Sequence, residues 1–136
     1  MTIDTNIIIA YLSGDEKVVK TLHSLRKSGN VIFLPTIVEA ETLAFSNITR
    51  KERRYIEKFL EENFTSIPFD RLVARIASNI RVETKIKFPD AVIAATAIFT
   101  HSPLITRDKK HFKITHKFLT NLNLFPYINT KYQNKY

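Results

Sequence analysis

FPDAVIAATAIFTHSPLITRDKKHF, residues 88–112, is the stretch that decides the fold. Its first half is a run of apolar residues behind Pro89-Asp90, a pair that predicts a cap before a helix over 91–100. A short β-branched strand pattern over 104–106 follows that helix. An apolar helix that leads into a short strand is typical of an α/β domain.

Three further strand patterns, at 2–3, 31–34 and 65–67, alternate with helical patterns in the rest of the chain. The predicted fold class is therefore α/β, with a mainly parallel central sheet flanked by helices. A chain of 136 residues can bury one sizeable core but is too short for two ordinary domains. We expect one domain over 1–126 and a polar C-terminal tail over 127–136.

Helix starts are marked by two capping-box patterns, Ser13-x-x-Glu16 and Thr49-x-x-Glu52. A further helix is predicted over about 37–45, and Glu41 falls in the middle of its apolar arc. The arc consists of Ile37, Val38, Ala44 and Phe45. Because a carboxylate is rarely buried without a partner, Glu41 either binds a cation in a site or lies at a rim beside a Lys or Arg.

Composition excludes several classes of protein. Without Cys there are no disulfides, thiolate zinc sites or cysteine nucleophiles, and the four His show no metal-ligand spacing. Two glycines far apart cannot form the phosphate loops of the usual ATPases, GTPases or Rossmann dehydrogenases. The longest apolar stretch, 91–99, is less than half of the ~20 residues that a membrane span needs. Without a signal-peptide pattern at the N-terminus, we expect a cytoplasmic protein with no membrane contact.

The net charge of +8 favours a polyanionic partner, nucleic acid first and an anionic membrane surface second. Five basic residues flank Asp90 and Asp108 in the sequence, and we expect them to hold phosphates there. They are Lys85, Lys87, Arg107, Lys109 and Lys110. A second basic group opens the helix after Thr49, where each charge opposes the helix dipole at a cost of ~0.3–1 kcal/mol. It consists of Arg50, Lys51, Arg53 and Arg54, and it is either a binding surface or a solvated face with compensating i,i+4 pairs.

Three aspartates lie where the predicted sheet ends. Asp4 follows the first strand, Asp108 follows the last, and Asp90 heads the apolar helix. Each alone could be a helix cap or a turn former. In open α/β sheets, however, ligands bind at the carboxyl ends of the strands, so their common location indicates a site. Together with Glu41 they would repel one another unless a hard divalent cation lay between them.

Four segments occur in an order and spacing that are specific when taken together: IDTN at 3–6, TIVEAETLA at 36–44, FPDAVIAATAI at 88–98 and LITRDKKHF at 104–112. In these segments the chain resembles the PIN-domain nucleases, most closely the VapC-type toxins of prokaryotic toxin–antitoxin pairs. Two departures from that pattern are a clipped first strand and His101-Ser102 where relatives have Gly before the last strand.

The resemblance implies that Asp4, Glu41, Asp90 and Asp108 form the catalytic site and bind Mg²⁺ or Mn²⁺, with Asn6 and Thr106 in support. It implies an endoribonuclease in which the metal activates water for in-line attack on a phosphodiester of tRNA or rRNA, leaving a 5′-phosphate and a 3′-hydroxyl. The chemistry is consistent, because a bound cation lowers the pKa of water and neutralises charge on phosphate oxygens. The implied partners are a cognate antitoxin and a second copy of the chain.

Other functions remain open at this stage. The chain could be a housekeeping RNA-processing nuclease with no antitoxin, or an RNA-binding module without catalysis. A phospho-acceptor signalling domain would need adjacent acids after the first strand, and these are not visible. A phosphatase of the haloacid dehalogenase type would need Asp-x-Asp, but the second position is Asn6.

Overall fold

A computed structural model describes residues 1–45 and 47–113 of the chain. Its strands are β1 (Thr2–Ile3), β2 (Phe33–Pro35), β3 (Thr65–Ile67) and β4 (Leu104–Ile105). They form one parallel sheet in the order β3-β2-β1-β4. The predicted parallel sheet is confirmed, with β2 beginning two residues later than its pattern. Residue 32 still bonds across the sheet, because its carbonyl accepts from the backbone N of Thr65 at 2.9 Å.

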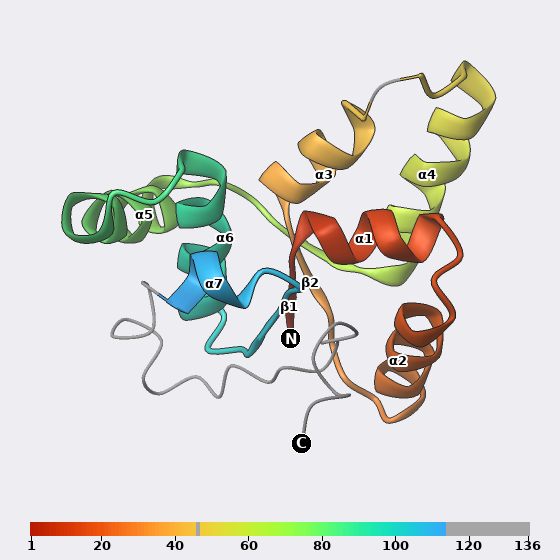
Figure 1. Ribbon diagram of the computed structural model, residues 1–136, viewed down its shortest axis with the longest axis horizontal. Coiled ribbons are helices and arrows are strands. Elements are labelled where there is room, and N and C mark those ends of the chain that lie inside the picture. The colour runs from red at the N-terminus through yellow and green to blue at the C-terminus, as the bar shows by residue number, and fades with distance from the viewer. Residues whose placement is uncertain (46, 114–136) are drawn as a thin grey trace.

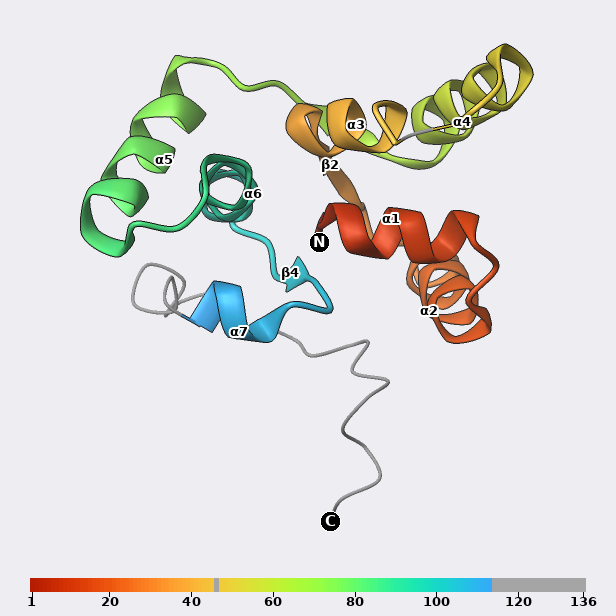
Figure 2. The same cartoon turned by 45° about the horizontal axis from the view of Figure 1, so that its top comes forward.

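Helices connect the strands and lie on both sides of them (Figure 1). They are α1 (Thr5–Leu12), α2 (Glu16–Lys27), α3 (Thr36–Leu43), α4 (Arg50–Asn63), α5 (Arg71–Thr84), α6 (Phe88–Phe99) and α7 (Lys109–Phe112). In both views α1 and α2 lie on one side of the strands and α5 and α6 on the other (Figure 2). This arrangement confirms the α/β class, because parallel strands need crossover connections that cover the faces of the sheet.

Helix α6 is the buried centre of one layer, as its apolar sequence predicts. All seven residues from Ala91 to Ala97 are buried, which is typical of a helix that is apolar all round. The helix begins at Phe88, three residues before the predicted start, because Pro89 in the first turn has no N–H to lose there. Asp90 therefore lies inside the first turn of α6, and its prediction as the cap is wrong.

The two capping boxes have different outcomes. The box at α4 is confirmed: the backbone N of Glu52 donates to Thr49 Oγ1 at 3.2 Å, and the backbone N of Thr49 donates to Glu52 Oε2 at 2.7 Å. The box at Ser13 is wrong, because Ser13 lies at the C-terminal end of α1 and donates to the carbonyl of Ile9. Gly14, with a φ of 77°, then reverses the chain, so that Asp15 caps α2 instead.

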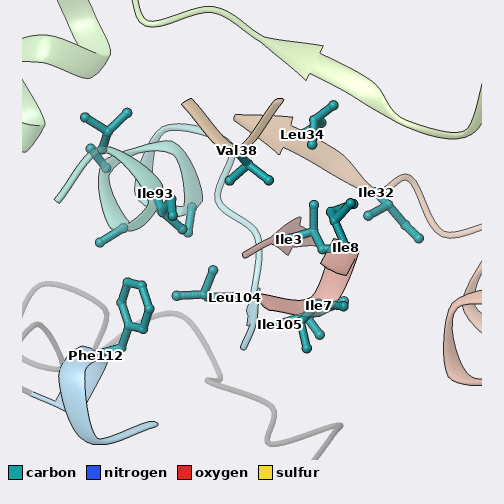
Figure 3. Close-up of a cluster of buried hydrophobic side chains, with 14 of the residues drawn as sticks. Ile3, Ile7, Ile8, Ile32, Leu34, Val38, Ile93, Leu104, Ile105 and Phe112 are labelled. Carbon is teal, nitrogen blue, oxygen red and sulfur yellow. The ribbon is translucent and has the colours of Figure 1, made fainter. Parts of the chain in front are cut away.

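The core lies between the central strands and the helices beside them. Side chains of β1, β4 and α1 meet those of α6 and α7 there (Figure 3). Ile3, Ile7, Ile105 and Phe112 are all at most 2% exposed. Close packing of this kind makes the strand ends rigid. The residues that directly follow the strands are therefore held in fixed positions.

No helix among the described residues is long and apolar enough to cross a membrane. The predicted polar tail, 127–136, lies outside the described residues, as does the end of the predicted domain beyond 113.

Candidate active site

The four predicted acids all line one open pocket. Asp4 directly follows β1, Asp108 follows β4, Glu41 is on α3 behind β2, and Asp90 is in the first turn of α6. They meet because parallel strands present their carboxyl ends at the same edge of the sheet. The rest of the acidic pocket, as we call it, is lined by Thr5, Asn6, Ile9, Ala44, Phe45 and Phe112.

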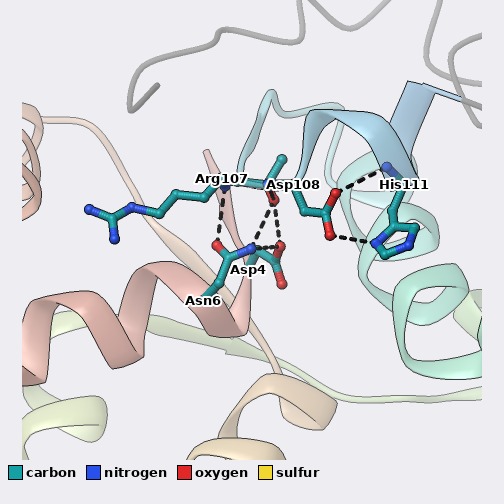
Figure 4. A network of polar contacts seen from close by, with 6 residues as sticks. Asp4, Asn6, Arg107, Asp108 and His111 are labelled. Carbon is teal, nitrogen blue, oxygen red and sulfur yellow. Dashed lines mark hydrogen bonds and ion pairs between the residues drawn. The ribbon is translucent and has the colours of Figure 1, made fainter. Parts of the chain in front are cut away.

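Asp4 is the most buried of the acids, with 5% of its surface exposed. Although it stands at the cap position of α1, it makes no capping hydrogen bond. Its Oδ2 instead accepts from Thr106 Oγ1 at 2.5 Å and from Asn6 Nδ2 at 2.9 Å (Figure 4). Burial raises the pKa of Asp4 to about 6, and the hydrogen bond from Thr106 opposes that rise. The two predicted supporting residues therefore contact the first acid directly.

Asp90 is half-buried, and its pKa is raised above the ordinary value, chiefly by burial. The charge of His111 opposes this rise, while the charges of Glu41 and Asp108 add to it. The same kind of repulsion acts on Asp4, from Asp90 and Glu41. Asp90 is therefore close enough to each of the other three acids for their charges to repel.

Glu41 accepts a hydrogen bond from Thr5 Oγ1 and takes part in no ion pair within the described residues. The pairing with a Lys or Arg is therefore not found among the described residues, and Glu41 is half-buried. The predicted apolar arc around it is wrong in part: Val38 is buried, but Ala44 and Phe45 are exposed and line the acidic pocket. That half of the arc faces the pocket instead of the core.

Asp108 both caps α7 and lines the acidic pocket. Its Oδ1 accepts from the backbone N of His111 at 3.1 Å, and its Oδ2 contacts His111 Nδ1 (Figure 4). The backbone N of Asp108 in turn donates to Thr106 Oγ1 at 2.9 Å. Thr106 thus connects the first and the last acid of the site.

Thr5 and His111 are site residues that the sequence analysis missed. Both are sequence neighbours of predicted acids, Thr5 next to Asp4 and His111 three residues after Asp108. Residues three apart lie on one face of a helical turn, so the spacing of Asp108 and His111 could have indicated their contact.

The donor atoms at the acidic pocket fit a hard divalent cation. Four carboxylates supply only oxygen, which Mg²⁺ and Mn²⁺ prefer, and a cation would relieve their mutual repulsion. Among the described residues, no three Asp, Glu or His side chains are gathered closely enough to hold an ion as they stand. Glu41 and Asp108 are each held by a hydrogen-bond donor of the protein.

Two of the predicted basic residues form ion pairs with carboxylates of the chain. Arg107 Nη2 lies 2.5 Å from Asp15 Oδ2, and this hydrogen bond holds the pKa of Asp15 below its ordinary value. Arg53 pairs with Glu57 at 2.9 Å, four residues along α4, and donates to the carbonyl of Leu43. The other predicted RNA contacts are exposed: Lys85, Lys87, Lys109, Lys110, Arg50, Lys51 and Arg54. The charge of Lys87 lowers the pKa of Asp90, so Lys87 acts on the acidic pocket.

Comparison with known proteins gives one family and several solved structures. The PIN domain model matches residues 1–117. A chain of a toxin–antitoxin complex from Klebsiella pneumoniae is 25% identical with a TM-score of 0.71, over 89% of this chain and 93% of that one. A chain of FitAcB from Neisseria gonorrhoeae is 31% identical with a TM-score of 0.68, over 83% and 91%. A chain of FitAB bound to an IR36 DNA fragment is 30% identical with a TM-score of 0.70, over 83% and 88%. No curated protein sequence matches.

Proposed function

Because this chain belongs to the PIN-domain family, we propose that it is a divalent-metal-dependent endoribonuclease and the toxin of a type II toxin–antitoxin pair. The observation that carries the nuclease proposal is the meeting of Asp4, Glu41, Asp90 and Asp108 in one pocket at the carboxyl edge of the sheet. Burial and mutual repulsion raise the pKa values of Asp4 and Asp90 there, which favours a cation as the ligand.

In this proposal the four carboxylates would hold Mg²⁺ or Mn²⁺, and the ion would compete with protons for them. A bound ion of this kind supplies a water of lowered pKa and neutralises charge on phosphate oxygens. The protein's own polar side chains orient the acids: Thr106 and Asn6 donate to Asp4, and Thr5 donates to Glu41. Such donors matter because the affinity of a metal site depends on the hydrogen bonds that orient its ligands.

The proposed substrate is RNA, either tRNA or rRNA, cut to a 5′-phosphate and a 3′-hydroxyl. Exposed lysines next to the acids support a polyanionic substrate, since Lys87 precedes α6 and Lys109 and Lys110 follow Asp108. Each would neutralise a phosphate and release a counterion. The net charge of +8 favours the same class of substrate.

The proposed partners are a cognate antitoxin and a second copy of this chain, and the proposed location is the cytoplasm. The toxin assignment rests on similarity to a chain solved as a toxin–antitoxin complex, together with the full set of acids. A housekeeping PIN-domain nuclease is the alternative. A small upstream reading frame whose product binds this chain and blocks its activity would favour the toxin.

The deciding experiment incubates purified protein with total cellular RNA and Mg²⁺ or Mn²⁺, and maps the 5′ ends. We expect a few discrete cuts that disappear with EDTA and with Asp90→Asn, because the variant removes one carboxylate without changing its size. Cleavage that Asp90→Asn retains would contradict the acidic mechanism. Binding of RNA with no cleavage by the folded, metal-loaded protein would favour an RNA-binding module instead.

A further inference from the structure

Arg107 lies between two residues of the candidate site, but its side chain leaves the acidic pocket. Figure 4 shows the guanidinium extending away from both Asp4 and Asp108. Its Nη2 reaches Asp15 Oδ2 at 2.5 Å, and both side chains are about a third exposed. A guanidinium already paired with a carboxylate adds little charge toward RNA, so the prediction of Arg107 as a phosphate contact does not fit this placement.

The turn around Arg107 is attached at two points, one at the start of α1 and one at the residue that caps α2. Its backbone N donates to Asn6 Oδ1 at 3.2 Å, near the start of α1. Its side chain reaches Asp15, three residues beyond the end of α1 at Leu12. Because one attachment lies near the start of α1 and the other beyond its end, a shift of the turn along α1 would break at least one of them.

The turn carries Thr106, one of the two side chains that donate to the first acid, and Asn6 of α1 is the other. Asn6 Nδ2 donates to Asp4 Oδ2 at 2.9 Å and to Thr106 Oγ1 at 3.3 Å. Thr106 Oγ1 donates to Asp4 and accepts from the backbone N of Asp108. A displacement of Arg107 would therefore move Thr106 and the backbone of Asp108 together, away from Asn6 and Asp4.

The environment of Arg107 indicates a structural role. Its Nε is buried with no hydrogen-bond partner among the described residues, and a guanidinium that gives up water needs a compensating carboxylate. Asp15 can supply one while it caps α2, because its Oδ1 accepts from the backbone N of Lys17 and Val18 and its Oδ2 remains for Arg107. One carboxylate thus connects the start of α2 with the turn of the active site.

We propose that Arg107 and Asp15 form a positioning ion pair, which holds Asn6, Thr106 and Asp108 in the arrangement from which the acidic pocket binds its divalent cation. The inference rests on the proposed function, since it concerns the same site. Neither residue touches the cation or the substrate, and both act through the turn that carries Thr106 and Asp108.

The test measures Mn²⁺ binding without RNA, by the electron paramagnetic resonance signal of the free ion, for the full chain carrying Arg107→Gln or Asp15→Asn. Asparagine keeps an oxygen for the cap of α2 and loses only the charge that faces Arg107. We expect each variant to weaken Mn²⁺ binding roughly 10-fold, the lower end of the loss for a direct partner of a metal ligand, because this pair acts one contact further away. The double variant should bind Mn²⁺ no more weakly than the weaker-binding single variant, because both substitutions remove the same contact.

Kinetics on an RNA substrate separate positioning from phosphate binding. Arg107→Gln and Asp15→Asn should lower kcat and leave KM within about twofold, since substrate binding is not removed. Lys109→Gln is the matched control: it makes the same change of charge two residues away, at an exposed side chain. This control should raise KM and leave Mn²⁺ binding unchanged. Arg107→Lys keeps the charge but lacks the planar guanidinium. Its kcat and its affinity for Mn²⁺ should lie between those of wild type and Arg107→Gln.

Two results would overturn the inference. One is a raised KM for Arg107→Gln with unchanged Mn²⁺ binding, which would make Arg107 a phosphate contact. The other is wild-type Mn²⁺ binding in Asp15→Asn. If Arg107→Gln fails to unfold cooperatively, Asp15→Asn and Arg107→Lys decide the question. A wild-type protein that binds no Mn²⁺ and cuts no RNA would instead contradict the proposed function.

Discussion

Asp4 is the residue whose ionisation opposes folding most clearly. It is 5% exposed, and burial raises its pKa from 3.8 to about 6. Between these two values the folded chain binds more protons than the unfolded chain, so the free energy of unfolding decreases as the pH rises from about 4 to about 6. The ionised carboxylate then costs roughly 3 kcal/mol, unless a cation compensates it.

Asp4→Asn should therefore stabilise the protein at pH 7.5 when EDTA removes divalent ions. We expect a gain of up to roughly 3 kcal/mol in the free energy of unfolding, which shrinks toward zero near pH 4 as the wild-type carboxyl becomes protonated. Urea unfolding at both pH values measures the difference. Added Mn²⁺ should stabilise the wild type more than the variant. A variant that is less stable than wild type at pH 7.5 in EDTA would contradict the account.

Thr106 opposes the rise in the pKa of Asp4 through its hydrogen bond. Thr106→Val keeps the shape and removes that donor, so the pKa of Asp4 should rise above about 6, and stability at pH 7.5 should fall by roughly 1.5–3 kcal/mol. Carbon-13 NMR of the Asp4 carboxyl follows the pKa. Thr100→Val is the control, because Thr100 Oγ1 bonds Thr2 and Ser102 instead. An unchanged pKa in Thr106→Val would separate Thr106 from the electrostatics of the site.

At the scale of elements, periodicity predicted the strands and helices better than their ends. Strand β3 matches its predicted range over 65–67, because the β-branched Thr65 and Ile67 favour a strand and no helical pattern overlaps them. The start of α6 was predicted too late because Pro89 suits either a cap or a first turn. The start of α2 was misassigned because Ser13-x-x-Glu16 and Asp15 both carry capping chemistry, and only the turn at Gly14 decides between them.

The two capping patterns can be compared by mutation. Thr49→Ala should destabilise the protein by about 1 kcal/mol, since it removes the acceptor for the backbone N of Glu52 at the start of α4. Ser13→Ala should change stability by less than about 0.5 kcal/mol, because the exposed Ser13 side chain caps no helix start and donates only to a carbonyl within α1. Urea unfolding of both variants tests this. Equal losses of stability in the two variants would indicate that Ser13 also caps a helix.

The positions of the acids were predictable, but the directions of several side chains were not. Strand ends place Asp4 and Asp108 at one edge whatever their partners, so the order of segments was sufficient. The direction of Arg107 depends on Asp15, which is 92 residues away in the sequence. The hydrogen bond between Thr5 and Glu41 depends in the same way on how α1 packs against α3. Such contacts arise only when the elements are assembled.

On the scale of the whole molecule, the basic residues lie in separate regions. Lys109 and Lys110 are on α7 beside the acidic pocket, whereas Arg50 and Lys51 begin α4. In both views the start of α4 and α7 lie on opposite sides of the strands (Figures 1 and 2). In the proposed nuclease, a net charge of +8 would attract RNA to the whole surface, but only cations beside the acidic pocket could contact phosphates next to the bond that is cut.

The salt dependence of RNA binding distinguishes these two regions. Measurements use an Asp90→Asn background, so that RNA stays intact, and a single-stranded RNA probe. Replacing Lys109 and Lys110 by Gln should reduce the slope of log K against log salt by about 1.4, since each lost phosphate contact accounts for about 0.7 on a single strand. Replacing Arg50 and Lys51 by Gln makes the same change in net charge and should leave the slope nearly unchanged. If the α4 pair lowers the slope as much as the α7 pair, RNA binds across the surface, and cations beside the acidic pocket do not determine its placement.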